Sequence, residues 1–151
     1  MSTQEDRTQI IDALYRYAYH FDRNEPDTAA ALFSEDAVVD YGPETDNIEG
    51  RVALAEVLGI GLAETFAATS HHITNPMVTI DGDEATLIAY VYAWHRYMDG
   101  SPDGYLWGQY HTKLRRTQQG WSFYEMVLKG AGIVDFHRAT MHPIGRRELS
   151  P

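Results

Sequence analysis

The amino-acid sequence predicts an α+β protein in which helices come first and a sheet of antiparallel or mixed strands follows. Over residues 3–23 and 50–66 the apolar residues recur every three or four positions, whereas from residue 69 they alternate with polar ones. Long antiparallel strands bury one face well only when the sheet curves. We therefore expect a cone-shaped, strongly curved sheet wrapped around the N-terminal helices, with a pocket at its wide end.

Length and charge narrow the class of protein. A chain of 151 residues is long enough to build one domain with its own core. Its formal net charge of −10 argues against nucleic acid and against a membrane surface as partners, because both attract basic faces. The start of the chain is polar and no apolar run approaches the ~18 residues of a membrane-spanning helix, so we expect a cytoplasmic protein.

The first helix is expected over residues 3–23. Ile10, Leu14 and Phe21 lie on one apolar face of this segment, which should be buried. Asp22 falls at the margin of that face near the helix end, where a carboxylate can face a cavity. On the residues alone, Asp22 also fits an ordinary turn residue, because a loop-like segment follows it.

The next segments are shorter. Residues 24–27 break the first helix, and residues 27–33 fit a short second helix. Residues 37–41 are strand-like and stop at a Gly-Pro pair. Residues 50–66 return to helical spacing, although two glycines weaken this prediction, Gly59 and Gly61.

Four strands are expected in the second half, over residues 71–80, 85–97, 105–116 and 121–134. The first begins in the stretch Thr69–Asn75, where two histidines interrupt an apolar alternating pattern. His71 and His72 point to opposite faces of a strand, so only one can enter the pocket and the pair is not a two-ligand metal clamp. Either could also be a structural histidine. The domain should comprise residues 1–135, and residues 136–151 should form a peripheral arm.

The second and third of these strands add further candidates. His95 shares one face with small residues that leave room for a ligand, whereas Tyr90 and Tyr92 lie on the opposite face. That aromatic face suits contact between copies of the chain, so we expect a homodimer or homotrimer formed through the sheet. In the next strand, Gln109 and His111 share a face and are placed to line the same cavity.

The order of the motifs resembles a known family. Phe21-Asp22, Asp40-Tyr41, the stretch Thr69–Asn75 and Trp94-His-Arg-Tyr97 are similar to the SnoaL-like branch of the nuclear-transport-factor-two-like superfamily. This branch includes scytalone dehydratase and hexachlorocyclohexane dehydrochlorinase. The resemblance extends to about residue 135 and implies a cystatin-like α+β barrel with a cofactor-free pocket.

The resemblance also implies roles for individual residues. Asp22 and His71 match the pair that takes a proton from carbon in both lyases, and Tyr41 matches a tyrosine that acts on the substrate oxygen. His95 resembles the second histidine of the dehydratase, and His111 falls where the dehydratase has an asparagine. Two departures argue against transferring either exact substrate: Phe21 replaces a tyrosine, and Tyr17 replaces a lysine.

Acid-base chemistry is consistent with this assignment. A histidine suits the abstraction of a moderately acidic proton, and a carboxylate on its other nitrogen fixes the tautomer. We therefore predict a cofactor-independent and metal-free lyase that dehydrates a small, mostly apolar cyclic hydroxy-carbonyl compound. The alternatives are a ketone isomerase or polyketide cyclase with the same base, and a non-catalytic binding module. The expected catalytic residues are Asp22, His71, Tyr41 and His95, and the expected substrate-binding residues are Tyr15, Tyr17, Phe21, Asn75, Gln109 and His111.

Overall fold

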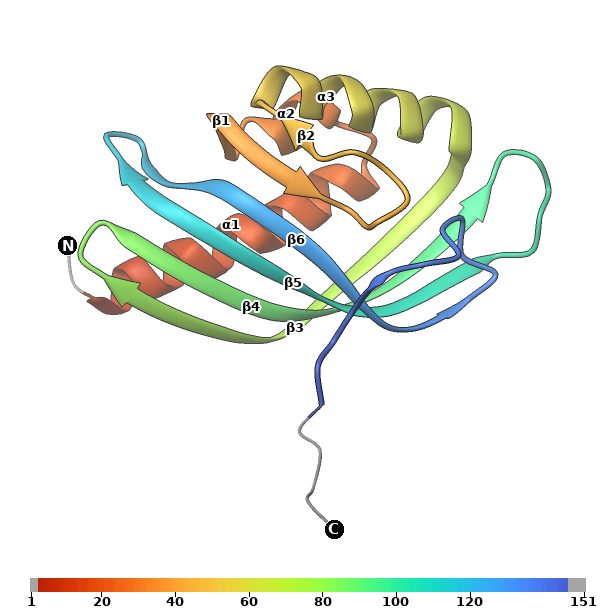
Figure 1. Cartoon of the computed structure of the whole chain (residues 1–151). Helices are drawn as coiled ribbons and strands as arrows, with labels where there is room; N and C mark the ends of the chain where they lie inside the picture. Colours follow the sequence, from red (N-terminus) through yellow and green to blue (C-terminus); the bar gives the residue numbers. More distant parts are fainter. Residues whose placement is uncertain (1–2, 147–151) are drawn as a thin grey trace, which may run out of the picture.

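The computed structural model describes residues 3–146 (Figure 1). Its helices are α1 (Thr3–Asp22), α2 (Pro26–Ala30) and α3 (Arg51–Ile60), and α3 continues into a π-helical turn, η1 (Gly61–Thr65). The strands are β1 (Phe33–Asp40), β2 (Ile48–Glu49), β3 (Phe66–Asp81), β4 (Glu84–Tyr97), β5 (Gly104–Thr117), β6 (Gly120–Val134) and β7 (His142–Pro143). No helix in this part of the chain is both long and apolar enough to cross a membrane.

One strongly curved sheet holds all the strands between residues 3 and 146, in the order β2-β1-β6-β5-β4-β3, with β7 beside β6. The pairs β1–β6 and β6–β7 are parallel and the others are antiparallel. The helices lie in the concave side of the sheet (Figure 1). The prediction of an α+β fold with a curved mixed sheet around N-terminal helices is therefore confirmed, although the sheet does not close into a barrel.

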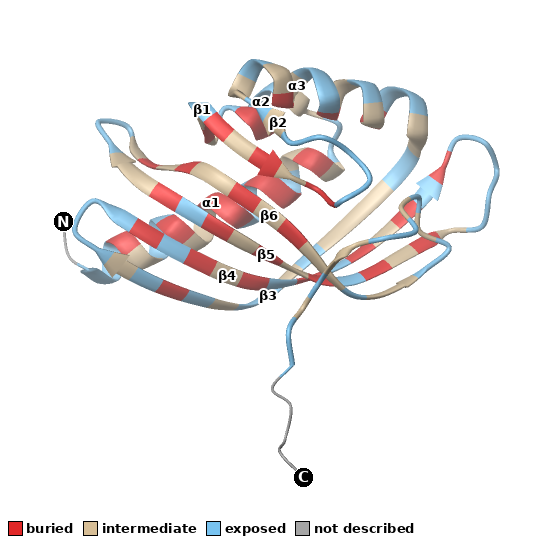
Figure 2. Cartoon of the chain, in the orientation of Figure 1, coloured by how far each residue is buried: buried red, intermediate tan, exposed pale blue. Residues whose placement is uncertain are grey.

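Alternating burial along the strands places the core on the concave side. Leu87, Ala89 and Ala93 of β4 are fully buried, whereas Tyr90 and Tyr92 between them are exposed. Figure 2 shows this alternation along β4 and β5, and a buried stripe along the face of α1 that meets them. The core therefore lies between the concave face of the sheet and the helices.

Two segments differ from the sequence prediction. Phe33 was expected in the second helix but begins β1, because its buried ring packs against Phe123 of the neighbouring strand at a centroid distance of 5.1 Å. The third helix was expected to reach about Phe66. Instead it changes at Gly61 into the π-helical turn, and Phe66 begins β3. The wider turn keeps Leu62 buried at the cavity wall.

A bulge in β3 changes which side chains face the core. The register with β4 shifts between Thr74 and Met77, and Asn75 adopts a left-handed backbone conformation with φ of 53°. Beyond the bulge Val78 is buried, whereas Met77 is exposed. Asn75 is itself exposed, so its expected place in the pocket is wrong: the bulge interrupts the alternation that put it on the face of His71.

The arm expected over residues 136–151 is described as far as residue 146, and its first part packs against the sheet; residues 147–151 lie outside the described part of the chain. The chain turns back so that β7 pairs with β6 next to the end of β1. There the Nε2 atom of His142 lies 3.0 and 2.9 Å from the two carboxylate oxygens of Asp40. This contact holds residues 136–138 over the concave side, where they line the cavity.

Candidate active site

A cavity of about 160 Å³ lies between α1, the end of α3 and the concave face of the sheet. Its volume is close to that of a cavity of about 150 Å³ that accommodates benzene in another protein, so it has room for one six-membered ring. The apolar wall consists of Phe21, Val57, Leu58, Leu62, Phe66, Leu106, Leu128 and Phe136. The polar groups come from Tyr17, Tyr41, Thr65, His71, His95, Tyr110, His137 and Arg138.

Asp22 and His71 are directly hydrogen-bonded. The Nδ1 atom of His71 lies 2.7 Å from Oδ1 of Asp22, and the backbone N–H of His71 donates to Oδ2 at 2.8 Å. The hydroxyl of Thr69 donates to Oδ1 at 2.9 Å. An ionised carboxylate can only accept hydrogen bonds, so Nδ1 of His71 must be the donor. A neutral His71 ring therefore carries its proton on Nδ1 and has its lone pair on Nε2.

The position of Asp22 follows from the elements that carry it. It is the last residue of α1, and Thr69 and His71 lie two residues apart on the same face of β3. Burial opposes ionisation of the Asp22 carboxyl, but the hydrogen bonds from His71 and Thr69 outweigh it and lower its pKa. The carboxylate therefore remains charged and fixes both the ring orientation and the tautomer of His71.

His95 lies beside His71 in a different environment. The two ring centroids are 5.4 Å apart, and His95 is only 3% exposed. Its Nδ1 atom has no hydrogen-bond partner among the described residues. Burial, reinforced by the nearby His71 and His137 rings, lowers the pKa of His95 to about 3. His95 is therefore neutral at pH 7.

Three tyrosines bring hydroxyl groups to the cavity wall. The hydroxyls of Tyr17 and Tyr41 are hydrogen-bonded, and the ring of Tyr110 meets that of Tyr17 edge to face at a centroid distance of 5.8 Å. Burial raises the pKa of Tyr41 to about 12 and also raises the pKa values of Tyr17 and Tyr110. All three are thus neutral hydrogen-bond donors near pH 7.

Several expected substrate-binding residues lie elsewhere. Gln109 and His111 are hydrogen-bonded to each other at 2.9 Å, but they lie on the face of β5 opposite to Tyr110. Tyr15 is 44% exposed on the surface of α1 and does not line the cavity. These three expectations are wrong: Gln109 and His111 lie on the face of β5 that is turned away from the cavity, and Tyr15 lies on the exposed face of α1. Tyr17 and Phe21 do line the cavity, as expected.

The separation of His111 from the cavity also bears on metal binding. His71 and His95 line the cavity, but His111 lies on the other side of the sheet, so these three histidines do not converge on one point. Within residues 3–146 no group of three or more histidine, aspartate or glutamate side chains is arranged to hold a metal ion.

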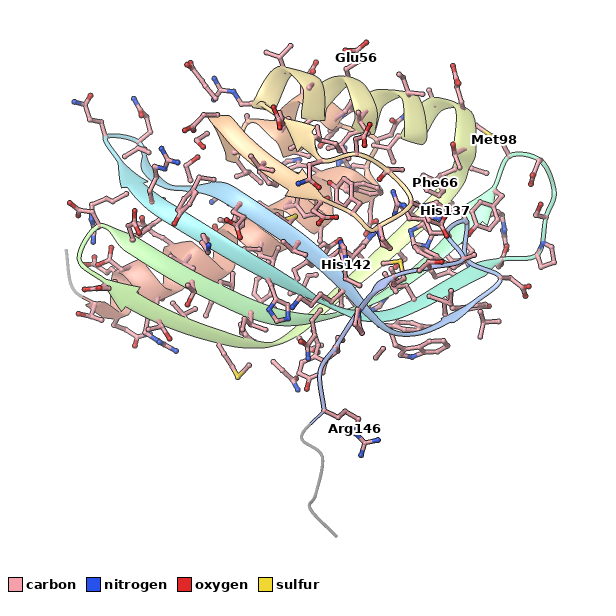
Figure 3. The ribbon with its side chains drawn as sticks, viewed as in Figure 1. Glu56, Phe66, Met98, His137, His142 and Arg146 are labelled. Atoms are coloured by element: carbon pink, nitrogen blue, oxygen red, sulfur yellow. The ribbon has the colours of Figure 1, made fainter. Side chains whose placement is uncertain are left out.

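Most residues of the cavity wall were not among the predicted site residues, and four of these bear on its chemistry or its closure. In the sequence Tyr110 looks like an ordinary core aromatic between two polar neighbours. Its position on the face of the strand opposite to Gln109 and His111 was the signal that could have identified it. Phe136, His137 and Arg138 lie in a coil with no periodicity to reveal their orientation. In Figure 3, His137 lies next to Phe66, and their ring centroids are 5.0 Å apart.

A family comparison agrees with this architecture. The sequence profile of the SnoaL-like domain matches residues 2–127. The chain belongs to this family. No match was found among curated proteins. The structural relatives of this SnoaL-like chain include nuclear-transport-factor-two-like proteins, among them one from Salmonella enterica.

Two of these relatives come from Novosphingobium aromaticivorans. A candidate scytalone dehydratase is 35% identical, with a TM-score of 0.89 over 96% of this chain and 97% of the other. A candidate aromatic ring hydroxylase is 28% identical, with a TM-score of 0.82 over 89% and 95% of the two chains. A hexachlorocyclohexane dehydrochlorinase shares the fold at 15% identity, with a TM-score of 0.80 over 98% and 95%.

Proposed function

We propose that the protein is a cofactor-independent lyase that removes water from a small cyclic hydroxy-carbonyl compound. The observation that carries this proposal is the hydrogen bond between Asp22 and Nδ1 of a His71 ring that lines a largely apolar cavity. A buried imidazole oriented by a carboxylate is suited to general-base catalysis. The similarity to a candidate scytalone dehydratase supports the same reaction class.

The proposed reaction begins with Nε2 of His71, which removes a proton from the carbon next to the carbonyl group. The electron pair moves to the carbonyl oxygen, and the enolate formed is stabilised by the hydroxyl of Tyr41. When the enolate collapses, the carbon–carbon double bond forms and the bond to the β-hydroxyl breaks. The His71 imidazolium gives its proton to the departing hydroxyl, so that water leaves and the base is restored.

The environment of His95 assigns it a different part in this reaction. Because its pKa is about 3, the His95 ring is neutral at pH 7 and cannot act as a general acid in the imidazolium form. The His95 ring lines the cavity beside His71, so a bound substrate would contact it. We assign His95 to substrate positioning, and the volume of about 160 Å³ restricts the substrate to about one ring.

The test uses a panel of monocyclic β-hydroxy ketones and follows the ultraviolet absorbance of the conjugated product. Wild type is compared with His71→Ala, and His72→Ala is the matched control because His72 is exposed on the opposite face of β3. We expect the first substitution to reduce turnover by roughly 10²–10⁴-fold and the second to leave it unchanged. Turnover unaffected by His71→Ala would remove the proposed base.

The same panel distinguishes the alternative functions. Exchange of the carbon-bound hydrogen for deuterium without loss of water, dependent on His71, identifies an isomerase or cyclase with the same base. Saturable binding without exchange or elimination identifies a non-catalytic ligand-binding protein.

A further inference from the structure

Arg138 brings a permanent positive charge to the cavity wall. It belongs to the segment after β6, and its guanidinium carbon lies 5.6 Å from the centre of the Tyr41 ring. It is the one arginine or lysine among the described residues that line the cavity. Its positive charge opposes part of the rise that burial causes in the pKa of Tyr41 and adds to the lowering of the pKa of His95, so it lies within electrostatic range of both groups.

Within residues 3–146, Arg138 forms no ion pair and no hydrogen bond, unlike the other arginines near carboxylates. Arg96 pairs with Asp103, for example, and Arg116 with Asp6. The chain has 22 acidic and 12 basic residues, so carboxylates are not scarce. Arg138 is partly exposed and its guanidinium lies over the Tyr41 ring, so its N–H donors, which no carboxylate of the described residues takes, can meet an anionic group of a ligand.

Two carboxylates flank Gly42 in the sequence, beside the side chain of Arg138, and both have other partners. Asp40 contacts Nε2 of His142, and Glu44 accepts a hydrogen bond from the backbone N–H of Thr140 at 2.6 Å. These two contacts fix residues 140–142, which follow Arg138 in the chain. Its side chain passes Gly42, where an added Cβ would lie 3.6 Å from its Cδ atom. The guanidinium is therefore held at the cavity without being neutralised.

We propose that Arg138 is a specificity-determining residue that binds an anionic oxygen group, such as a carboxylate, on the ring of the ligand. A guanidinium presents parallel N–H donors that match the two oxygens of a carboxylate. The consequence for turnover rests on the proposed function: the substrate class narrows to monocyclic hydroxy-carbonyl acids. The binding preference itself does not depend on catalysis.

The experiment measures binding of benzoate and of benzamide by isothermal titration calorimetry. These probes have nearly the same size and shape and differ in charge. Wild type should bind benzoate at least about tenfold more tightly than benzamide, and Arg138→Gln should abolish that preference. Arg138→Lys keeps the positive charge but loses the planar pair of N–H donors, so this variant should retain part of the preference for benzoate.

Arg146→Gln is the matched control, because it removes the same charge from the same segment at an exposed position directed away from the cavity (Figure 3). It should keep the preference for benzoate. Circular dichroism and thermal melting establish that each variant is folded. Equal binding of the two probes by wild type, or a benzoate preference that survives in folded Arg138→Gln, would overturn the proposal.

The two proposals fail in different ways. If benzoate is preferred through Arg138 but no substrate is turned over with dependence on His71, the anion site stands and the lyase proposal fails. If neutral hydroxy ketones are dehydrated with dependence on His71 while benzoate and benzamide bind equally, the anion site fails and the lyase proposal stands.

Discussion

Replacing Asp22 with asparagine tests the central pair with almost no change in side-chain volume. The carboxylate accepts hydrogen bonds from the Thr69 hydroxyl, from the backbone N–H of His71 and from the Nδ1–H of the same ring. Asparagine keeps one oxygen acceptor and turns the other position into a donor. It therefore removes the charge, breaks part of this hydrogen bonding and no longer enforces one tautomer of His71.

The expected effect on activity is a loss of roughly 10²–10⁴-fold in kcat with a smaller change in KM. Hydrogen bonds to a charged group contribute about 1.5–3 kcal/mol each, and asparagine retains part of the set. We therefore expect about 2 kcal/mol lower free energy of unfolding at pH 7, or a thermal midpoint lower by roughly 4–8 °C.

The stability difference has a defined pH dependence. The folded-state pKa of Asp22 lies below the model-compound value of 3.8, so the carboxylate stabilises the fold fully above that value. This contribution disappears as the pH falls through the folded-state pKa, and wild type and Asp22→Asn should converge in acid. Urea unfolding at pH 7 and in steps below pH 4 measures both limits.

Asp46→Asn is the control, because Asp46 is exposed in the loop before β2. It should match wild type in activity and in its pH profile. If Asp22→Asn is destabilised but retains activity within tenfold of wild type, Asp22 serves only to anchor the end of α1 to β3. The acid-base interpretation of the site would then be refuted.

Four further predictions follow from other parts of the molecule. Tyr41→Phe should reduce turnover by roughly 10²–10³-fold while leaving the protein folded, and unchanged kcat would exclude Tyr41 as the oxyanion donor. Because the pKa of folded His95 is lowered, wild-type stability should fall as the pH drops from about 6.5 toward 3, by at most about 1.4 kcal/mol per pH unit; His95→Asn should lack this component of the unfolding curve. Asp6→Asn should lower the thermal midpoint at pH 7, because the Asp6 carboxylate accepts hydrogen bonds from Arg116 and Trp121, which lower its pKa to about 2. An equal loss of thermal midpoint at pH 2 would contradict this cause. We also propose that the chain self-associates through the exposed face that carries Tyr92, and that Tyr92→Lys weakens this association. Sedimentation equilibrium at micromolar concentration tests this, and a 17.1 kDa species alone for both proteins would contradict it.

The fold was predictable where an element is buried on one side only, because its apolar residues then recur at regular intervals in the sequence. Leu87, Ala89 and Ala93 alternate with exposed residues because one face of β4 packs against helices. Phe33 was not predictable in the same way, because a short apolar run fits a helix or a buried strand equally well. The bulge at Asn75 was also missed, since alternation continues in the sequence even where the backbone shifts by a residue.

The site was predictable only in part, because its members come together through tertiary packing. Asp22 and His71 are 49 residues apart, and their pairing was indicated by the family resemblance rather than by spacing. Tyr110 carried a parity signal that its polar neighbours obscured. Arg138 carried none, because its orientation depends on the contact between His142 and Asp40 and not on a local pattern.

The pair of histidines explains why environment, rather than residue type, sets the roles in this cavity. Two imidazolium rings 5.4 Å apart would repel by about 3 kcal/mol at an effective dielectric constant of about 20, so a second proton would be disfavoured roughly a hundredfold. Only His71 has a carboxylate partner to stabilise a positive charge, whereas burial keeps His95 neutral. The neutral state of His95 thus leaves His71 free to take up a proton during turnover. A substitution that let His95 become charged would be expected to weaken His71 as a base.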